Sequence, residues 1–153
     1  MGRINEKGKR FEFLVARLDE AKDKGYYIEA MAIAYALLEE RTYSLLDKLG
    51  IPYRSRDKLY NCLEFFREHV NDRKITITPN KITVDELTDW LKIEFFDSGL
   101  VDNIQCWRDK RNNVVHDLAK TTIDYSDLKE PSDNGSEYFR TYSALIMRLK
   151  KII

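Results

Sequence analysis

The clearest structural signal in this 153-residue chain lies in residues 28–49, which read IEAMAIAYALLEERTYSLLDKL. Apolar positions recur there at steps of three and four residues, the spacing that places side chains on one face of an α-helix. This stripe consists of Met31, Tyr35, Leu38, Thr42, Leu45 and Leu49. Gly50 and Pro52 follow it, and both are typical of the end of a helix. The stretch therefore predicts a long helix against which the rest of the chain packs.

Five further segments on either side show the same helical periodicity. They are residues 11–18, 59–70, 87–95, 100–120 and 139–149. Thr83 and Glu86 stand ahead of the third segment in the pattern of a capping box, which predicts that a helix begins there. The fourth segment predicts a second long helix.

Two segments lack this periodicity. Residues 74–82, KITITPNKI, alternate Ile with Thr up to Pro79 and predict an extended connector or a small hairpin. Residues 121–135 are acidic and rich in turn formers, so we expect them to separate the last two helices. The chain offers no parallel-strand pattern and no linker long enough to divide it. We predict one all-α domain over residues 1–153, a bundle of five to six helices around two long antiparallel helices.

The composition excludes several classes of protein. The 26 basic and 26 acidic side chains cancel, unlike those of strongly basic proteins that coat nucleic acids or membrane surfaces. Hydrophobic residues make up 43% of the chain, too many for a disordered one. No apolar run approaches the roughly 18 residues of a membrane span, so we expect no membrane association and a cytoplasmic location. Cys62 and Cys106 have no Cys or His at metal-ligand spacing, and we expect buried thiols, with no metal and no cofactor.

The predicted helix at 100–120 breaks its own pattern. Its apolar stripe runs from Ile104 to Leu118 and passes through Arg111. A charge on the buried line of a helix must be paired or solvated, because an unpaired buried charge costs several kcal/mol. On the neighbouring face, Asn112 and His116 are one turn apart. Such breaks in the binary pattern are typical of functional or strained sites.

The segment WRDKRNNVVHDL, residues 107–118, resembles the HEPN family at Arg111, Asn112 and His116. The family motif is an Arg, a polar residue, a few further residues and then a His, and four residues separate Arg from His here. Family members are small all-α bundles with the motif on a late long helix that packs against an earlier long helix. Some toxin members carry a Tyr two residues after the His. Leu118 stands there in this chain, so a modification switch at that position is not implied.

The resemblance implies a metal-independent endoribonuclease that acts as a toxin or antiviral defence effector. His116 would take the proton from a ribose 2′-hydroxyl or give one to the leaving 5′-oxygen. Arg111 would bind the scissile phosphate, and Asn112 would orient the phosphate or the imidazole. The RNA products would carry a 2′,3′-cyclic phosphate and a 5′-hydroxyl. Family members pair two motif helices, which implies a homodimer with helix 100–120 at its interface, and an antitoxin or regulatory partner would fit this role.

Other residues are predicted to support this site. On the facing long helix, Glu39 is the expected partner of Arg111, with Glu40 as the alternate. Five basic residues in two segments are expected to guide RNA: Arg108, Lys110, Arg54, Arg56 and Lys58. Residues 121–137 offset this local charge with five acidic side chains against one basic, and they are a candidate for the rim of the site.

Two interpretations of the motif stay open. Besides a ribonuclease, it would fit a non-catalytic binding or dimerisation module of the same fold, for instance one that partners a nucleotidyltransferase. In the plainest case, Arg111 makes a structural ion pair and His116 is an ordinary helix histidine. His69 is expected at the surface, and Trp90 and Trp107 are expected in the core rather than at an RNA-stacking surface.

Overall fold

The computed structural model describes residues 6–118, 120 and 124–153. In chain order the elements are α1 (Glu6–Asp23), α2 (Tyr27–Leu49), α3 (Leu59–Asn71), α4 (Val84–Leu91), the π-helical segment η1 (Lys92–Asp97), α5 (Leu100–Asp117), the 3₁₀ turn η2 (Tyr125–Leu128) and α6 (Lys129–Ile152). The described residues contain no β-strand. The prediction of an all-α bundle is therefore confirmed.

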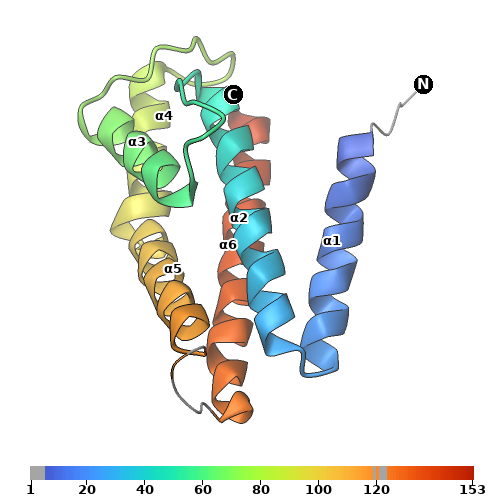
Figure 1. Cartoon of the computed structure of the whole chain (residues 1–153). Coiled ribbons are helices and arrows are strands. Elements are labelled where there is room, and N and C mark those ends of the chain that lie inside the picture. Colours follow the sequence, from blue (N-terminus) through green and yellow to red (C-terminus); the bar gives the residue numbers. More distant parts are fainter. Residues whose placement is uncertain (1–5, 119, 121–123) are drawn as a thin grey trace.

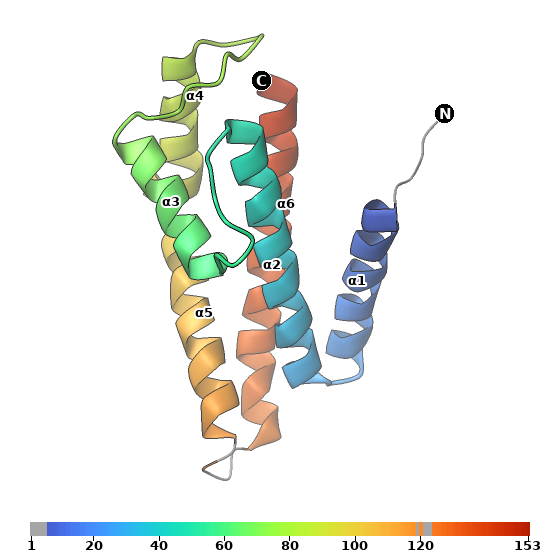
Figure 2. The same cartoon turned by 45° about the horizontal axis from the view of Figure 1, so that its top comes forward.

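Helix α2 lies in the middle of the bundle, between α1 on one side and α3 and α5 on the other (Figure 1 and Figure 2). It runs antiparallel to α5, as predicted, but it packs more extensively against α6, which runs parallel to it. In the centre of this contact the buried hydroxyls of Thr42 and Tyr142 share a hydrogen bond of 2.8 Å. The core is thus built on α2 and α6, and α5 covers one side of it.

Two helix ends follow local sequence signals. After α2, Gly50 adopts a left-handed conformation with φ 68°, and the Ile51 N–H donates to the Leu46 carbonyl at 2.9 Å. Before α4, the Thr83 hydroxyl accepts the Glu86 N–H, and the Glu86 carboxylate accepts the Thr83 N–H, each at 3.1 Å. The predicted capping box is therefore present. These ends could be predicted because neighbours in the sequence form them.

The last helix begins earlier than predicted. We expected a turn-rich separator at 121–135, but η2 and α6 already occupy residues 125–135, while 121–123 lie outside the described residues. Pro131 stands in the first turn of α6. Backbone N–H groups in this turn have no acceptor within the helix, so proline, which has no N–H, is tolerated there. A Cβ on Gly135 would lie 2.4 Å from Trp107 Cζ2, and the Trp107 Nε1–H donates to the Pro131 carbonyl at 2.7 Å. Residues typical of a turn are therefore helical here because Trp107 of α5 packs on them.

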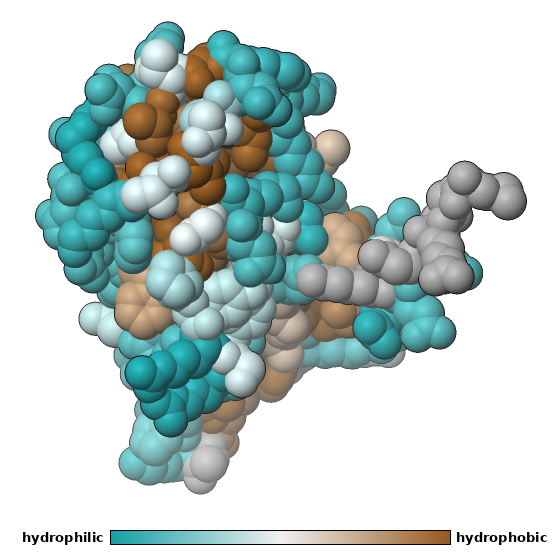
Figure 3. All heavy atoms as spheres, turned by 90° about the horizontal axis from the view of Figure 1, so that it is seen from above, coloured by the Kyte–Doolittle hydropathy of each residue, from teal (hydrophilic) through white to brown (hydrophobic). Residues whose placement is uncertain are grey.

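The connector between α3 and α4 is extended chain, and no hairpin forms. Its Asn80 N–H donates to the Ile153 carbonyl at 3.1 Å, which joins it to the end of α6. Hydrophobic residues gather at this end of the bundle when it is viewed from above (Figure 3). The connector lines a cavity of about 270 Å³ there with Ile75, Ile77 and Ile82. Among the described residues, no helix combines the length and the apolar character that a membrane crossing requires.

The π-helical segment η1 was not predicted. The helix that begins at Val84 continues into it, and the wider turn places Phe95 in the core. Its ring meets that of Phe66 edge-on at 5.2 Å between centroids and that of Tyr142 at 5.9 Å. This aromatic cluster joins α3, η1 and α6, and η1 leads through Gly99 into α5.

Candidate functional site on α5

The two halves of α5 differ in burial. Its first half, residues 100–107, buries four side chains: Leu100, Val101, Ile104 and Trp107. Its second half, residues 108–117, buries none and carries the Arg, Asn and His of the predicted motif. We call residues 108–117 the polar half of α5. Here Val114 is partly buried against the core, and the long side chains of Arg108 and Arg111 lie against α3 and α2.

Arg111 is half-buried against α2. Its guanidinium carbon lies 4.6 Å from the centroid of the Tyr35 ring, within the range of a cation–π interaction. Its Nη1 donates to Asn112 Oδ1 at 3.0 Å, and its Nε is buried without a hydrogen-bond partner. No carboxylate among the described residues forms an ion pair with it. Arg111 is therefore a positioned cation that lacks a protein counter-ion within the described chain.

The predicted ion pair between Arg111 and Glu39 is not present. The Glu39 carboxylate accepts the Leu59 N–H at 3.2 Å, at the start of α3 where helical N–H groups are free. Glu40 pairs with Arg41 at 3.4 Å. Since the first turn of α3 engages Glu39, the ring of Tyr35, one turn earlier on α2, lies against Arg111 instead.

The phenol of Tyr35 is close enough to Glu39, Arg111 and Arg108 for their charges to affect its pKa. Burial raises the pKa of the Tyr35 phenol, and the nearby Glu39 adds to this, whereas Arg111 and Arg108 act in the opposite direction. The phenol is thus influenced by one carboxylate and two guanidinium groups. Sequence reasoning assigned Tyr35 only to the apolar stripe. Its position one turn before Glu39 on the predicted facing helix was the signal that could have identified it.

Asn112 and His116 are both exposed and lie one turn apart. His116 is five residues after Arg111, about 140° around the helix, so the two side chains do not face each other directly. The hydrogen bond from Arg111 to Asn112 links the guanidinium to the residue that shares a face with His116. The His116 imidazole makes no hydrogen bond with a described residue. It is therefore accessible to a ligand but is not held by a second protein group there.

Arg108 connects the polar half of α5 to α3. Its guanidinium carbon lies 4.9 Å from the centroid of the Tyr60 ring, and its Nε donates to Gln105 Oε1 at 3.1 Å. Gln105 Nε2 donates in turn to the Tyr60 carbonyl at 3.2 Å. Arg108 also pairs with the neighbouring Asp109. Tyr60 was not singled out from the sequence, because only the fold brings it to α5.

A basic loop, residues 53–58, leads into the first turn of α3, which contacts Arg108. Arg54, Arg56 and Lys58 are all exposed, and Lys58 directly precedes the first residue of α3. The loop is held in place by Asp57, whose carbonyl accepts the Tyr43 hydroxyl at 2.6 Å and whose carboxylate accepts the Arg54 N–H at 2.7 Å. Because Tyr60 in the first turn of α3 contacts Arg108, Lys58 at the end of the loop is two residues from that contact.

Lys110 lies on a different side of α5 from these residues. It lines a cavity of about 200 Å³ with Cys106 and Asn134 of α6. Cys106 is exposed, so the prediction that both thiols are buried is wrong for this one, which lies at the edge of the α5–α6 contact. Cys62 is buried as expected, and burial raises the pKa of its thiol to about 11, which keeps it protonated near neutral pH. Lys110 is thus separated from the predicted RNA-guiding group.

The two tryptophans and His69 differ in burial. Trp107 is in the core, as predicted. Trp90 is only partly buried and meets the Phe95 ring edge-on at 5.9 Å. His69 is also partly buried rather than fully at the surface, and its Nδ1 lies 2.8 Å from the Phe65 carbonyl, one turn earlier on α3.

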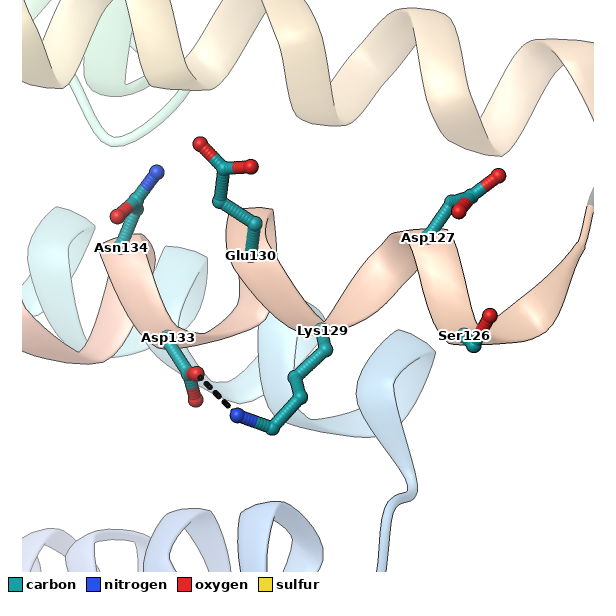
Figure 4. Close-up of a pocket in the computed structure, with 6 residues that line it drawn as sticks. All are labelled: Ser126, Asp127, Lys129, Glu130, Asp133 and Asn134. Atoms are coloured by element: carbon teal, nitrogen blue, oxygen red, sulfur yellow. Dashed lines mark hydrogen bonds and ion pairs between the residues drawn. The ribbon is translucent and has the colours of Figure 1, made fainter.

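A cavity of about 640 Å³ lies at the start of α6, lined by Ser126, Asp127, Lys129, Glu130, Asp133 and Asn134. Asp127, Glu130 and Asn134 point to one side of α6, and Lys129 and Asp133 form a 3.3 Å ion pair on the other (Figure 4). Three carboxylates against one ammonium make this cavity unsuitable for a phosphate. Within the described chain, no group of three or more His, Cys, Asp or Glu side chains is arranged to hold a metal ion.

Comparisons of this chain with protein-family models, with curated protein sequences and with solved structures give no match. The resemblance to the HEPN family therefore rests on Arg111, Asn112 and His116 and on the all-α bundle that carries them.

Proposed function

We propose that this chain is a metal-independent endoribonuclease of the HEPN type, a toxin or antiviral defence effector that cleaves RNA in the cytoplasm. The observation that carries the proposal is the state of Arg111. It is half-buried and positioned by Tyr35 and Asn112, and no carboxylate among the described residues neutralises it. Partial burial of a charge without a counter-ion is costly, and a phosphate that binds there would remove this cost.

The reaction would follow from the residue types at this site. His116 takes the proton from a ribose 2′-hydroxyl, and the 2′-oxygen attacks the adjacent phosphorus. The bond from phosphorus to the 5′-oxygen breaks, and that oxygen leaves with a proton from a general acid. Arg111 binds the non-bridging oxygens, where negative charge increases in the transition state. The products are a 2′,3′-cyclic phosphate and a 5′-hydroxyl.

A single motif helix supplies one histidine, whereas this reaction uses a base and an acid. A homodimer in which two copies of the polar half of α5 face each other would provide both groups. Val115, an apolar side chain that is 42% exposed next to His116, would lie at this interface. The site would then be a composite of two Arg111 and two His116 side chains. An antitoxin or another regulatory partner would control such an enzyme.

A second candidate function is a non-catalytic binding module, for instance one that partners a nucleotidyltransferase. It is favoured by one observation about His116, whose imidazole has no hydrogen-bond partner among the described residues. Catalytic histidines are usually oriented by a second group. In such a module, Arg111 would bind the phosphate of a nucleotide and His116 would be a surface residue.

The two candidates are distinguished by RNA cleavage with a matched histidine control. We expect the wild-type chain and His69→Ala to cleave RNA equally, with or without EDTA, and His116→Ala to be slower by about 10²- to 10⁴-fold. An all-2′-deoxy oligonucleotide of the same sequence should stay intact. Expression of wild type, but not of His116→Ala, should arrest growth. If His116→Ala matched wild type in both assays, the nuclease proposal would be abandoned in favour of the module.

A further inference from the structure

Two arginines on α5 lie against tyrosine rings from two different helices. Arg111 lies over Tyr35 of α2 and Arg108 over Tyr60 of α3, with 4.6 and 4.9 Å between guanidinium carbon and ring centroid. The two rings differ in accessibility. Tyr35 is partly buried, whereas Tyr60 is a surface residue that is 49% exposed. Only the second pair therefore offers an aromatic surface to a ligand.

The Arg108 side chain of this pair is held in place before any ligand binds. Gln105 links the two residues, since its amide donates to the Tyr60 backbone carbonyl and to the Glu64 carboxylate, and its side-chain oxygen accepts from Arg108. The Arg108 side chain is only 15% exposed, and Asp109 pairs with it. A surface that is ordered in advance loses little conformational entropy on binding. This separates Tyr60 from a solitary exposed side chain such as Tyr26, for which the structure gives no such support and which is 51% exposed.

The charge next to Tyr60 fits a polyanion. Arg54, Arg56 and Lys58 precede it in an exposed loop, and none of them forms an ion pair with a described residue. The single acidic residue of the loop, Asp57, is directed at the backbone of the loop itself. The carboxylates of Asp109 and Glu64 lie beside Arg108 and Gln105, but the three cations of the loop form no ion pair within the described chain. Unpaired cations next to an aromatic ring are typical of surfaces that bind single-stranded nucleic acids.

We propose that Tyr60 and Arg108 form a base-stacking platform for single-stranded RNA, next to the phosphate site at Arg111. This inference rests on the proposed function and assigns its substrate class. Arg108 and Arg111 are about 4.5 Å apart along the helix axis, so a phosphate at Arg111 and a base on Tyr60 belong to neighbouring parts of one strand. Arg54, Arg56 and Lys58 contact phosphates further along that strand. Paired RNA is excluded from the platform because stacking within a duplex hides the faces of its bases.

The platform is tested by RNA binding in the His116→Ala background, in which the bound RNA stays intact. A fluorescently labelled single-stranded RNA and a duplex of the same sequence are titrated with protein, and anisotropy gives the Kd. Removing one base–aromatic stack weakens binding roughly 5- to 150-fold, and we expect this loss of single-strand affinity for Tyr60→Ala. Tyr60→Trp should bind like the parent because it keeps a stacking surface. Tyr26→Ala is the matched control and should leave the Kd unchanged.

The salt dependence separates stacking from charge. Each phosphate contact with a single strand contributes about 0.7 to the slope of log K against log salt. Replacing Arg54, Arg56 and Lys58 with Ala should therefore reduce the magnitude of that slope by about 2. Tyr60→Ala should leave that slope unchanged. Thermal unfolding of each variant shows whether it is folded. A Kd for Tyr60→Ala within about twofold of the parent, or an equal loss in Tyr26→Ala, would overturn the platform.

The platform and the nuclease can fail separately. If wild type does not cleave RNA but binding depends on Tyr60, the platform stands and the proposed catalytic function falls. If wild type cleaves RNA and Tyr60→Ala changes neither the Kd nor the KM, the nuclease stands and the platform falls.

Discussion

The two halves of α5 meet neighbouring helices in different ways. In residues 100–107 the side chains are packed into the core, and Trp107 fits over Gly135 and donates to the Pro131 carbonyl. In residues 108–117 no side chain is buried, and Arg108 and Arg111 lie against tyrosine rings. The first half fixes where the helix lies, so that the second half can carry polar groups at defined positions. The variants below test this division, from the largest expected effect to the smallest.

Trp107→Ala should cause the largest loss of stability. It removes a buried indole from the α5–α6 contact together with its hydrogen bond to Pro131. Truncation of a buried Trp to Ala typically destabilises a protein by about 3–5 kcal/mol. Urea denaturation should show this decrease in the free energy of unfolding. A loss below about 1 kcal/mol would show that Trp107 does not hold α5 in its position.

Gly135→Ala should be destabilising, although Ala is the better helix former. The added Cβ would lie 2.4 Å from Trp107 Cζ2, so the indole must shift. Overpacking of this kind costs about 1–3 kcal/mol, and the gain in helix propensity offsets about 1 kcal/mol. We expect a net loss of up to about 2 kcal/mol in urea denaturation. In the Trp107→Ala background the loss should vanish, and a loss that persists there would show that the indole is not its cause.

Tyr35→Leu should slow RNA cleavage more than it affects stability. Leu fills part of the same space but offers no π face to Arg111. A cation–π interaction contributes about 0.5–2 kcal/mol, which corresponds to a decrease in kcat/KM of about 2- to 30-fold. Tyr35→Phe keeps the ring and should cleave at nearly the wild-type rate. Equal rates for Tyr35→Leu and Tyr35→Phe would show that the ring does not position Arg111.

Thr83→Ala should have the smallest effect and should leave the site unchanged. It removes the capping box of α4, far along the chain from the polar half of α5. Loss of an N-cap side chain costs about 1 kcal/mol. Thr76→Ala is the control, because Thr76 is exposed in the connector. RNA cleavage by Thr83→Ala should match wild type once both proteins are folded, and a selective loss of cleavage would connect α4 to the site.

Features made by neighbours in the sequence could be predicted, and features made by distant residues could not. The long helix α2, its end at Gly50 and the capping box at Thr83 all follow local signals. The start of α6 was missed because residues 121–135 have the composition of a loop. What makes residues 129–135 helical is the contact with Trp107, more than 20 residues earlier in the chain.

The same distinction applies to the site. The motif residues could be identified because Arg111 interrupts an apolar stripe and Asn112 and His116 share a face. The partner of Arg111 was predicted one turn away from its actual position, at Glu39 rather than Tyr35. Helical periodicity shows which side of α2 faces α5, but not that the N-terminus of α3 engages the Glu39 carboxylate. The role of Tyr60 likewise depends on where α3 begins.

The most direct test of the division within α5 is a paired measurement on Arg111→Lys: the rate of RNA cleavage and the free energy of unfolding. Lys keeps the positive charge but lacks the planar guanidinium that stacks on Tyr35, donates to Asn112 and can bind two phosphate oxygens at once. We predict that cleavage falls by about 100-fold or more while the free energy of unfolding stays within about 1 kcal/mol of wild type. Wild-type cleavage by Arg111→Lys, or a loss of cleavage that only accompanies unfolding, would contradict a chemical role for the polar half of α5.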